Sequence, residues 1–144
     1  MDSDFDFDMT LDDNGVLIFR FSGVFDVDKW AERQRAATAR IFPQGRDPMV
    51  PAVTDLRDFI PPPGDWTKIA KLVFGKMDTL GDAQQRCALI TGGNPGIKIA
   101  CRFYILSRTA VFRRKGETRD FSDFDEGYAW AAGALTDSVP TVVH

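Results

Sequence analysis

The chain contains very little histidine and cysteine. Its only histidine is the last residue, His144, and its only cysteines are Cys87 and Cys101. A single terminal histidine leaves no Ser-His-Asp triad, no Cys-His pair and no cluster of histidine metal ligands. We therefore expect no metal site, no cofactor and no conventional set of catalytic residues.

Long hydrophobic runs are also missing. No apolar stretch approaches the length of about 20 residues that spans a bilayer. The aspartate-rich N-terminus lacks the basic and apolar regions of a signal peptide. We expect a cytoplasmic protein without a membrane span, in which Cys87 and Cys101 are reduced, small buried side chains.

No strong excess of one charge is present. The chain has 18 basic and 21 acidic residues, and six of the acids are aspartates within the first 13 residues. The rest of the chain contains the other 15 acids and all 18 bases, so the body of the protein is only weakly basic. Nucleic-acid binding needs many more cations on one surface, so we consider it unfavoured.

The length and apolar content indicate one folded domain. The chain has 144 residues, of which 44% are hydrophobic, which excludes a disordered chain and leaves little room for a second domain. We expect a single domain over residues 1–144, with its core at about 5–135.

The N-terminal segment has the pattern of a β-hairpin. Acidic and apolar residues alternate strictly over residues 4–9, and Asn14-Gly15 is a strong hairpin-turn signal. The next strand, over residues 16–21, is more continuously apolar and therefore more central. The first strand is predicted at the sheet edge, where exposed aspartates oppose pairing with another chain.

Strands and helices alternate along the rest of the chain. Apolar runs predict strands over residues 51–58, 86–91 and 117–121, and helical spacing predicts helices over 26–42, 65–80, 97–111 and 123–135. Whether residues 97–111 form one continuous helix stays open; we expect Ala100, Val111 and either Phe103 or Tyr104 to face inward. Expected N-caps are Asp26, Asp65, Asn94 and Ser122. The order β-β-α-β-α-β-α-β-α predicts an α/β domain with a largely parallel sheet and one antiparallel hairpin.

Four short motifs in this order resemble the STAS domain, and more closely the small bacterial SpoIIAA-like proteins of the anti-sigma factor antagonist fold. The motifs are the opening strand at residues 15–23, Val53-Thr-Asp-Leu-Arg57, Ala88-Leu-Ile90, and residues 118–130 with Phe121 and Trp130. The resemblance covers roughly residues 5–135.

The resemblance implies mainly a fold. In anti-sigma factor antagonists, a serine at the start of the helix after the third strand is phosphorylated by a partner kinase. The corresponding residues 58–67 contain no serine, and their only hydroxyl, Thr67, lies just inside the predicted helix. A phosphorylation switch is therefore disfavoured. Some related domains hold small apolar ligands.

One candidate site lies at the end of the third predicted strand. The C-terminal end of a strand, where ligands often bind in α/β sheets, here carries Asp55, Arg57 and Asp58. Trp66 and Thr67 follow closely in the sequence. These residues form a candidate pocket for a ligand or partner. The simpler interpretation is that Arg57 pairs with a carboxylate and holds the proline-rich loop in place.

A second candidate is the loop before the third predicted helix. Gly93, Asn94 and Gly96 are candidates for binding an anion through backbone N–H groups. The phosphate-binding glycine motifs are missing, and Asn94 as N-cap with Pro95 at the first helical position explains the loop without a ligand.

Two further groups have simple structural interpretations as well. Tryptophans on three different predicted helices either line a shared pocket or pack in the core; they are Trp30, Trp66 and Trp130. A basic stretch comprises Arg102, Arg108 and residues 113–115, with Phe103 and Tyr104 nearby. It is either a docking surface for an acidic partner or nucleic acid, or a solvated helix end.

We therefore expect a non-catalytic module that binds a partner protein or a small apolar ligand. One alternative is an enzyme using Asp55 or Asp58 as general base, and another is a regulatory protein phosphorylated at Thr67. A homodimer is compatible with the sequence, which contains nothing that requires one.

Overall fold

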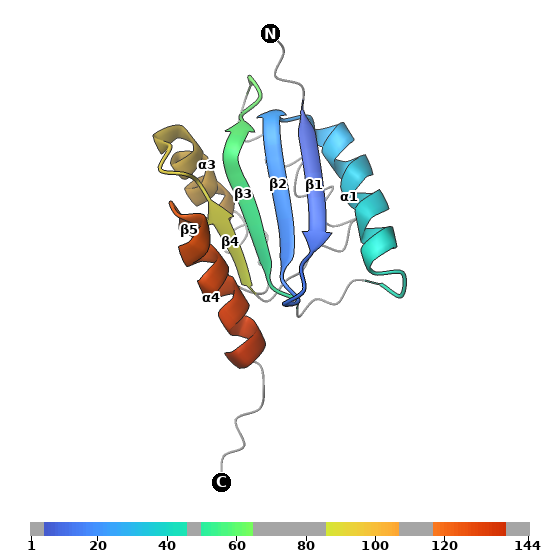
Figure 1. The fold of residues 1–144 in the computed structure, drawn as a ribbon. Helices are drawn as coiled ribbons and strands as arrows, with labels where there is room; N and C mark the ends of the chain where they lie inside the picture. Colours follow the sequence, from blue (N-terminus) through green and yellow to red (C-terminus); the bar gives the residue numbers. More distant parts are fainter. Residues whose placement is uncertain (1–4, 46–49, 65–85, 107–116, 138–144) are drawn as a thin grey trace.

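The computed structural model describes residues 5–45, 50–64, 86–106 and 117–137 (Figure 1). The first elements form the expected hairpin, in which β1 (Asp6–Leu11) pairs antiparallel with β2 (Leu17–Val24). In the turn, Asp12 Oδ1 accepts the backbone N–H groups of Asn14 (3.0 Å) and Val16 (2.9 Å). Gly15 has a φ of +87°, a conformation that glycine adopts without strain.

Three parallel strands extend the hairpin into one sheet. They are β3 (Ala52–Ile60), β4 (Arg86–Ile90) and β5 (Glu117–Phe121), and the sheet order is β1-β2-β3-β4-β5. Among the described strands, only the β1–β2 pair is antiparallel. The predicted α/β fold is thus confirmed. β3 is longer at its C-terminal end than predicted because Phe59 and Ile60 continue to pair with Gly23 and Val24.

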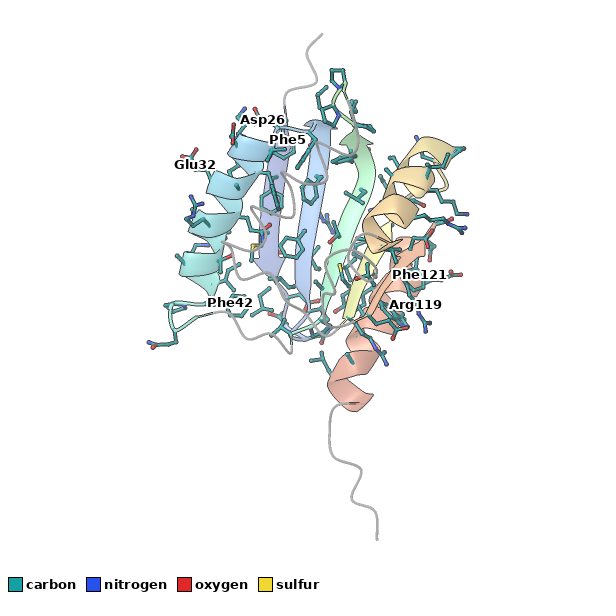
Figure 2. The ribbon with its side chains drawn as sticks, turned by 180° about the vertical axis from the view of Figure 1, so that it is seen from behind. Phe5, Asp26, Glu32, Phe42, Arg119 and Phe121 are labelled. Atoms are coloured by element: carbon teal, nitrogen blue, oxygen red, sulfur yellow. The ribbon has the colours of Figure 1, made fainter. Side chains whose placement is uncertain are left out.

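The helices cover the two faces of the sheet unequally. Figures 1 and 2 show α4 (Phe124–Asp137) on one face and α1 (Val27–Ile41) with α3 (Pro95–Leu106) on the other. Alternate residues of the strands belong to the two cores: Phe7, Met9 and Phe19 join the cluster with Trp30 of α1, whereas Val53 and Ile90 join the cluster with Ala131 of α4. The predicted helix at 65–80 lies outside the described residues. No described helix is long and apolar enough to cross a membrane.

Two of the predicted helix caps are present and one is displaced. Asp26 Oδ1 accepts the N–H of Lys29 (3.0 Å), and Asn94 Oδ1 accepts the N–H groups of Gly96 (2.9 Å) and Ile97 (3.2 Å). Before α4, Asp123 and not Ser122 is the cap, because its Oδ2 accepts the N–H of Glu126 (3.0 Å). Asp65 lies outside the described residues.

The inward face of α3 differs from the prediction. The buried residues are Ile97 and Cys101, one helical turn apart, whereas Ala100 is only partly buried. The helix begins at Pro95, so the row that meets the sheet starts at Ile97. Residues 107–111, including Val111, and the side chains of Phe103 and Tyr104 lie outside the described part of the chain.

The acidic strand β1 is an edge strand, as predicted. Asp6 and Asp8 are exposed. Two arginines of α1 reach this strand: Arg33 pairs with Asp6 (2.7 Å), and Arg40 Nη2 donates to the backbone oxygen of Met9 (3.4 Å). The edge thus carries charged groups and one occupied backbone acceptor, both of which discourage another chain from pairing there.

Gly127 allows α4 to approach the sheet closely. A Cβ atom at this position would overlap the side chain of Ile90 and lie 3.2 Å from Phe121 Cδ1 and 3.3 Å from Ala88 Cβ. Ile90 and Ala88 are fully buried, so these neighbours have little space to move. The helix packs at this distance from β4 because the residue at the contact has no side chain.

We expect Gly127→Ala to lower the free energy of unfolding by about 1–3 kcal/mol, because overpacking outweighs the gain in helix propensity. Urea unfolding followed by circular dichroism measures the change. Gly133→Ala is the matched control in the same helix, because its Cβ would meet only Arg86 Nη1, at 3.1 Å, and no atom of the buried core. That nitrogen donates to the backbone oxygen of Trp130 (2.8 Å), so we expect the control to cost clearly less stability than Gly127→Ala. Equal effects of the two substitutions would contradict the close-packing role of Gly127.

Candidate functional site

The carboxyl ends of β2, β3, β4 and β5 meet at one edge of the sheet, where both predicted sites lie. An irregularity in β3 shapes this edge: Arg20 pairs with Asp55, but Ser22 pairs with Asp58. β3 therefore contains one more residue than β2 over this stretch, which is a β-bulge. Bulges redirect side chains and are common beside functional sites.

Arg57, within the bulge, forms a two-pronged ion pair with Asp55. Its Nε lies 2.9 Å from Oδ1 of Asp55 and its Nη2 lies 2.7 Å from Oδ2. The backbone N–H of Arg57 also donates to Oδ1 (3.1 Å). Asp55 is only 8% exposed, so both oxygens of a buried carboxylate are held by one neighbouring residue.

The surroundings of Asp55 make it a weak proton acceptor. Burial alone would raise the pKa of Asp55, but the hydrogen bonds and charge of Arg57, together with the charge of Arg20, outweigh burial and hold the pKa below its usual value. A general base works best with a pKa near the working pH. The geometry therefore gives no support to Asp55 as a catalytic base.

Arg57 also contacts two neighbouring elements. Its guanidinium carbon lies 5.4 Å from the ring centre of Phe124, at the start of α4. A Cβ atom on Gly92, in the turn after β4, would lie only 2.9 Å from Arg57 Cγ. Gly92 has a φ of +68°, so both its conformation and this close approach favour glycine. Arg57 thus connects β3, α4 and the β4–α3 turn.

The N–H groups of the predicted anion loop are largely occupied within the loop. Gly93 donates its N–H to Thr91 Oγ1 (3.3 Å), and the N–H groups of Gly96 and Ile97 both point to Asn94 Oδ1. An anion would have to displace the Asn94 side chain. The loop geometry is that of a self-capped helix start.

A groove opens beside this loop, at the tip of β3. It has a volume of about 500 Å³ and is lined by Phe59, Ile60, Pro61, Asn94, Gly96, Ile97 and Ile99. Ile60 is 41% exposed and Ile99 is 72% exposed. Most of the lining is apolar, and the one amide side chain, Asn94, uses its oxygen to cap α3.

The groove was not predicted from the sequence, although one signal for it exists. Ile97 and Ile99 are two residues apart, and such positions lie on different faces of a helix. With Ile97 buried at 3% exposure, Ile99 has to face solvent. Phe59 and Ile60 follow the strand predicted over residues 51–58, so the sequence gives no reason to place their side chains beside α3.

Several other predicted site residues are not brought together. Trp30 and Trp130 belong to cores on opposite faces of the sheet, so they do not line a common pocket. Arg102 is exposed and lies 3.8 Å from Asp120. The remaining members fall outside the described residues: Trp66, Thr67, Arg108 and residues 113–115.

Comparisons with known proteins support the fold. No protein-family model and no curated protein matches the chain. An uncharacterised DUF3478-family protein with a SpoIIAA-like fold from Shewanella loihica PV-4 aligns with a TM-score of 0.59 and 17% identity, covering 90% of this chain and 94% of that one. The anti-sigma factor antagonist SpoIIAA, in its unphosphorylated form, aligns with a TM-score of 0.53 and 17% identity, covering 89% and 97%. The chain therefore has a SpoIIAA-like fold.

We expect Arg57→Met to lower the free energy of unfolding at neutral pH by about 1–3 kcal/mol, because it leaves the buried Asp55 carboxylate without its partner. The folded-state pKa of Asp55 is depressed, so the pair stabilises the wild type above the unfolded pKa of about 4, and this contribution is lost as the pH falls through the folded pKa. The difference between wild type and variant should therefore shrink below about pH 4. Urea unfolding at a series of pH values measures it.

The control is Asp55→Asn in the Arg57→Met background, which removes the carboxylate charge. This second substitution should recover part of the lost stability at neutral pH. A difference between wild type and Arg57→Met that stays constant with pH would show that the ion pair is not its source.

Proposed function

We propose that this protein is a non-catalytic regulatory module that binds a partner protein through the groove at the tip of β3. The observation that carries the proposal is the exposure of Ile60 and Ile99 on the two walls of one mainly apolar groove. Apolar side chains that gather around a concave surface commonly mark interaction sites.

The form of the groove favours a protein segment over a small apolar molecule. Small-molecule sites enclose most of the ligand surface. Here Ile99, at 72% exposure, stands largely in solvent. A groove with such a wall can accept a side chain from a helix or loop that continues across the surface.

The arrangement of the polar residues also favours binding over catalysis. Asp55 has both oxygens engaged by Arg57 and a lowered pKa. The structural neighbour SpoIIAA is described as an anti-sigma factor antagonist, a role that is exerted on another protein. The shared fold makes a role of this class our first choice for the present chain.

Co-purification from the source cells tests the proposal. The tagged full-length chain is compared with Ile99→Glu, which places a charge on the groove wall without altering a buried position. Leu11→Glu is the matched control, because Leu11 is an exposed apolar residue (40%) on β1, outside the groove. We expect a partner that is retained by the wild type and by Leu11→Glu and is reduced at least about tenfold with Ile99→Glu, since burying a charge is unfavourable.

A partner that is captured equally by all three chains would rule out the groove as its docking site. Extraction of the purified protein under denaturing conditions, followed by mass spectrometry, addresses the competing function. A stoichiometric apolar molecule that is present in the wild type and lost in Ile99→Glu would replace the protein partner with a small ligand.

A further inference from the structure

The last residues of β3 continue beyond the end of β4. β3 pairs with β4 only as far as Asp55, opposite Ile90. It pairs with β2 as far as Ile60, opposite Val24. Figure 1 shows β3 passing the end of β4. The end of β3 thus has a neighbouring strand on the β2 side and, among the described strands, none on the other side.

The backbone of Phe59 faces this free edge. Successive residues of a strand direct their N–H and C=O groups to opposite sides. Ile60 bonds to the β2 side, because its oxygen accepts the N–H of Phe25 (2.9 Å), so both groups of Phe59 point away from β2. Within the described ranges, neither group has a hydrogen-bond partner on another element. Phe59 therefore offers one donor and one acceptor at an unpaired edge, where another strand can add.

The groove at the tip of β3 lies along this edge. Phe59 and Ile60 are consecutive residues of a strand, so their side chains point to opposite faces of the sheet. Both nevertheless line the groove, whereas a groove on one face would be lined by only one of them. Because β2 occupies the other edge, the groove runs along the free edge, between the end of β3 and the start of α3.

Asn94 adds a fixed donor on the opposite wall. Its Oδ1 accepts two N–H groups at the start of α3, which sets the orientation of the amide and leaves Nδ2 pointing away from them. Asn94 is exposed and lines the groove. A chain that lies in the groove can therefore place a carbonyl oxygen on Nδ2 while an apolar side chain contacts Ile99.

We propose that the groove binds a segment of the partner protein in extended conformation, which adds to the free edge of β3 as a short strand. The backbone of the segment bonds to the N–H and C=O groups of Phe59, and its apolar side chains contact Ile60 and Ile99. This inference rests on the proposed function, because it assigns the conformation of the partner segment that the groove binds.

The unpaired backbone of Phe59 favours an extended segment over a helix. The backbone groups of a helix bond to one another, so a helix in the groove would cover the N–H and C=O groups of Phe59 without bonding to them. A covered polar group without a partner is unfavourable. In strand addition, main-chain hydrogen bonds supply affinity and contacts of alternate side chains supply specificity.

Hydrogen exchange of the free protein tests the open edge. We expect the amide of Phe59 to exchange at least about tenfold faster than the amide of Ile60, because Ile60 is paired with β2. NMR of the isotope-labelled full-length chain measures both rates. Equal protection of the two amides would show that the edge is already occupied and would overturn the proposal.

Three synthetic peptides then test the mode of binding. The first alternates valine and threonine, which favour the extended form. The second is the same peptide with N-methyl groups on its backbone nitrogens, which then cannot donate. The third carries the same number of apolar residues on one face of a helix. In NMR titrations, we expect the first peptide to shift the resonances of Phe59, Ile60 and Ile99 and to slow exchange of the Phe59 amide. It should bind at least about fivefold more tightly than the other two.

The variant Asn94→Asp keeps an oxygen that can cap α3 but removes the Nδ2 donor. We expect it to bind the first peptide about fivefold or more weakly than the wild type does, because a carboxylate cannot donate to the carbonyl of the peptide. Gln44→Glu is the matched control: it makes the same change from amide to carboxylate at an exposed residue outside the groove and should bind as the wild type does. Equal binding by the two variants would contradict the contact with Asn94.

The peptide titrations separate this inference from the proposed function. If the N-methylated or the helical peptide binds the groove as tightly as the extended peptide, strand addition is wrong and the groove stands as a binding surface. If none of the three peptides shifts the resonances of the groove residues, the groove itself is wrong as a binding surface, and the proposed function fails with the inference.

Discussion

The buried carboxylate of Asp55 is the constraint around which the carboxyl edge of the sheet is built. A carboxylate with 8% exposure needs a cation and several hydrogen bonds, since an unpaired buried charge is strongly unfavourable. Arg57 supplies three such bonds, and the bulge in β3 provides the extra residue that places it there. Arg57 in turn lies close to Gly92 and to the ring of Phe124.

This constraint extends to the groove through the β4–α3 turn. Gly92 in this turn packs against Arg57, and Asn94 and Gly96, a few residues later, line the groove. Residues of β3 also serve both features, since Asp55 and Arg57 lie in the same strand as Phe59 and Ile60. The ion pair therefore lies beside the two segments that supply the walls of the groove.

Local signals in the sequence predicted much of the fold. The Asn14-Gly15 turn, the caps at Asp26 and Asn94, and the strand at 117–121 each depend on a few neighbouring residues, and each is found in the structure. Serine and aspartate are both good N-caps, so the sequence does not decide between Ser122 and Asp123. Asp123 is the cap because α4 begins at Phe124, directly after it. The groove could not be predicted in this way, because Ile60 and Ile99 meet only after β3 pairs with β4 and α3 packs against the sheet.

The buried ion pair and the exposed wall of the groove respond differently to substitution. Substituting a residue in the Asp55–Arg57 pair changes a buried charge, so its effect appears first in stability. Ile99 has little burial to lose, so a polar residue there would be tolerated by the fold alone. In the proposed function, an isoleucine at this position gains its value from contact with a partner protein. On that proposal, the exposed end of the groove, more than the ion pair beside it, determines what is bound.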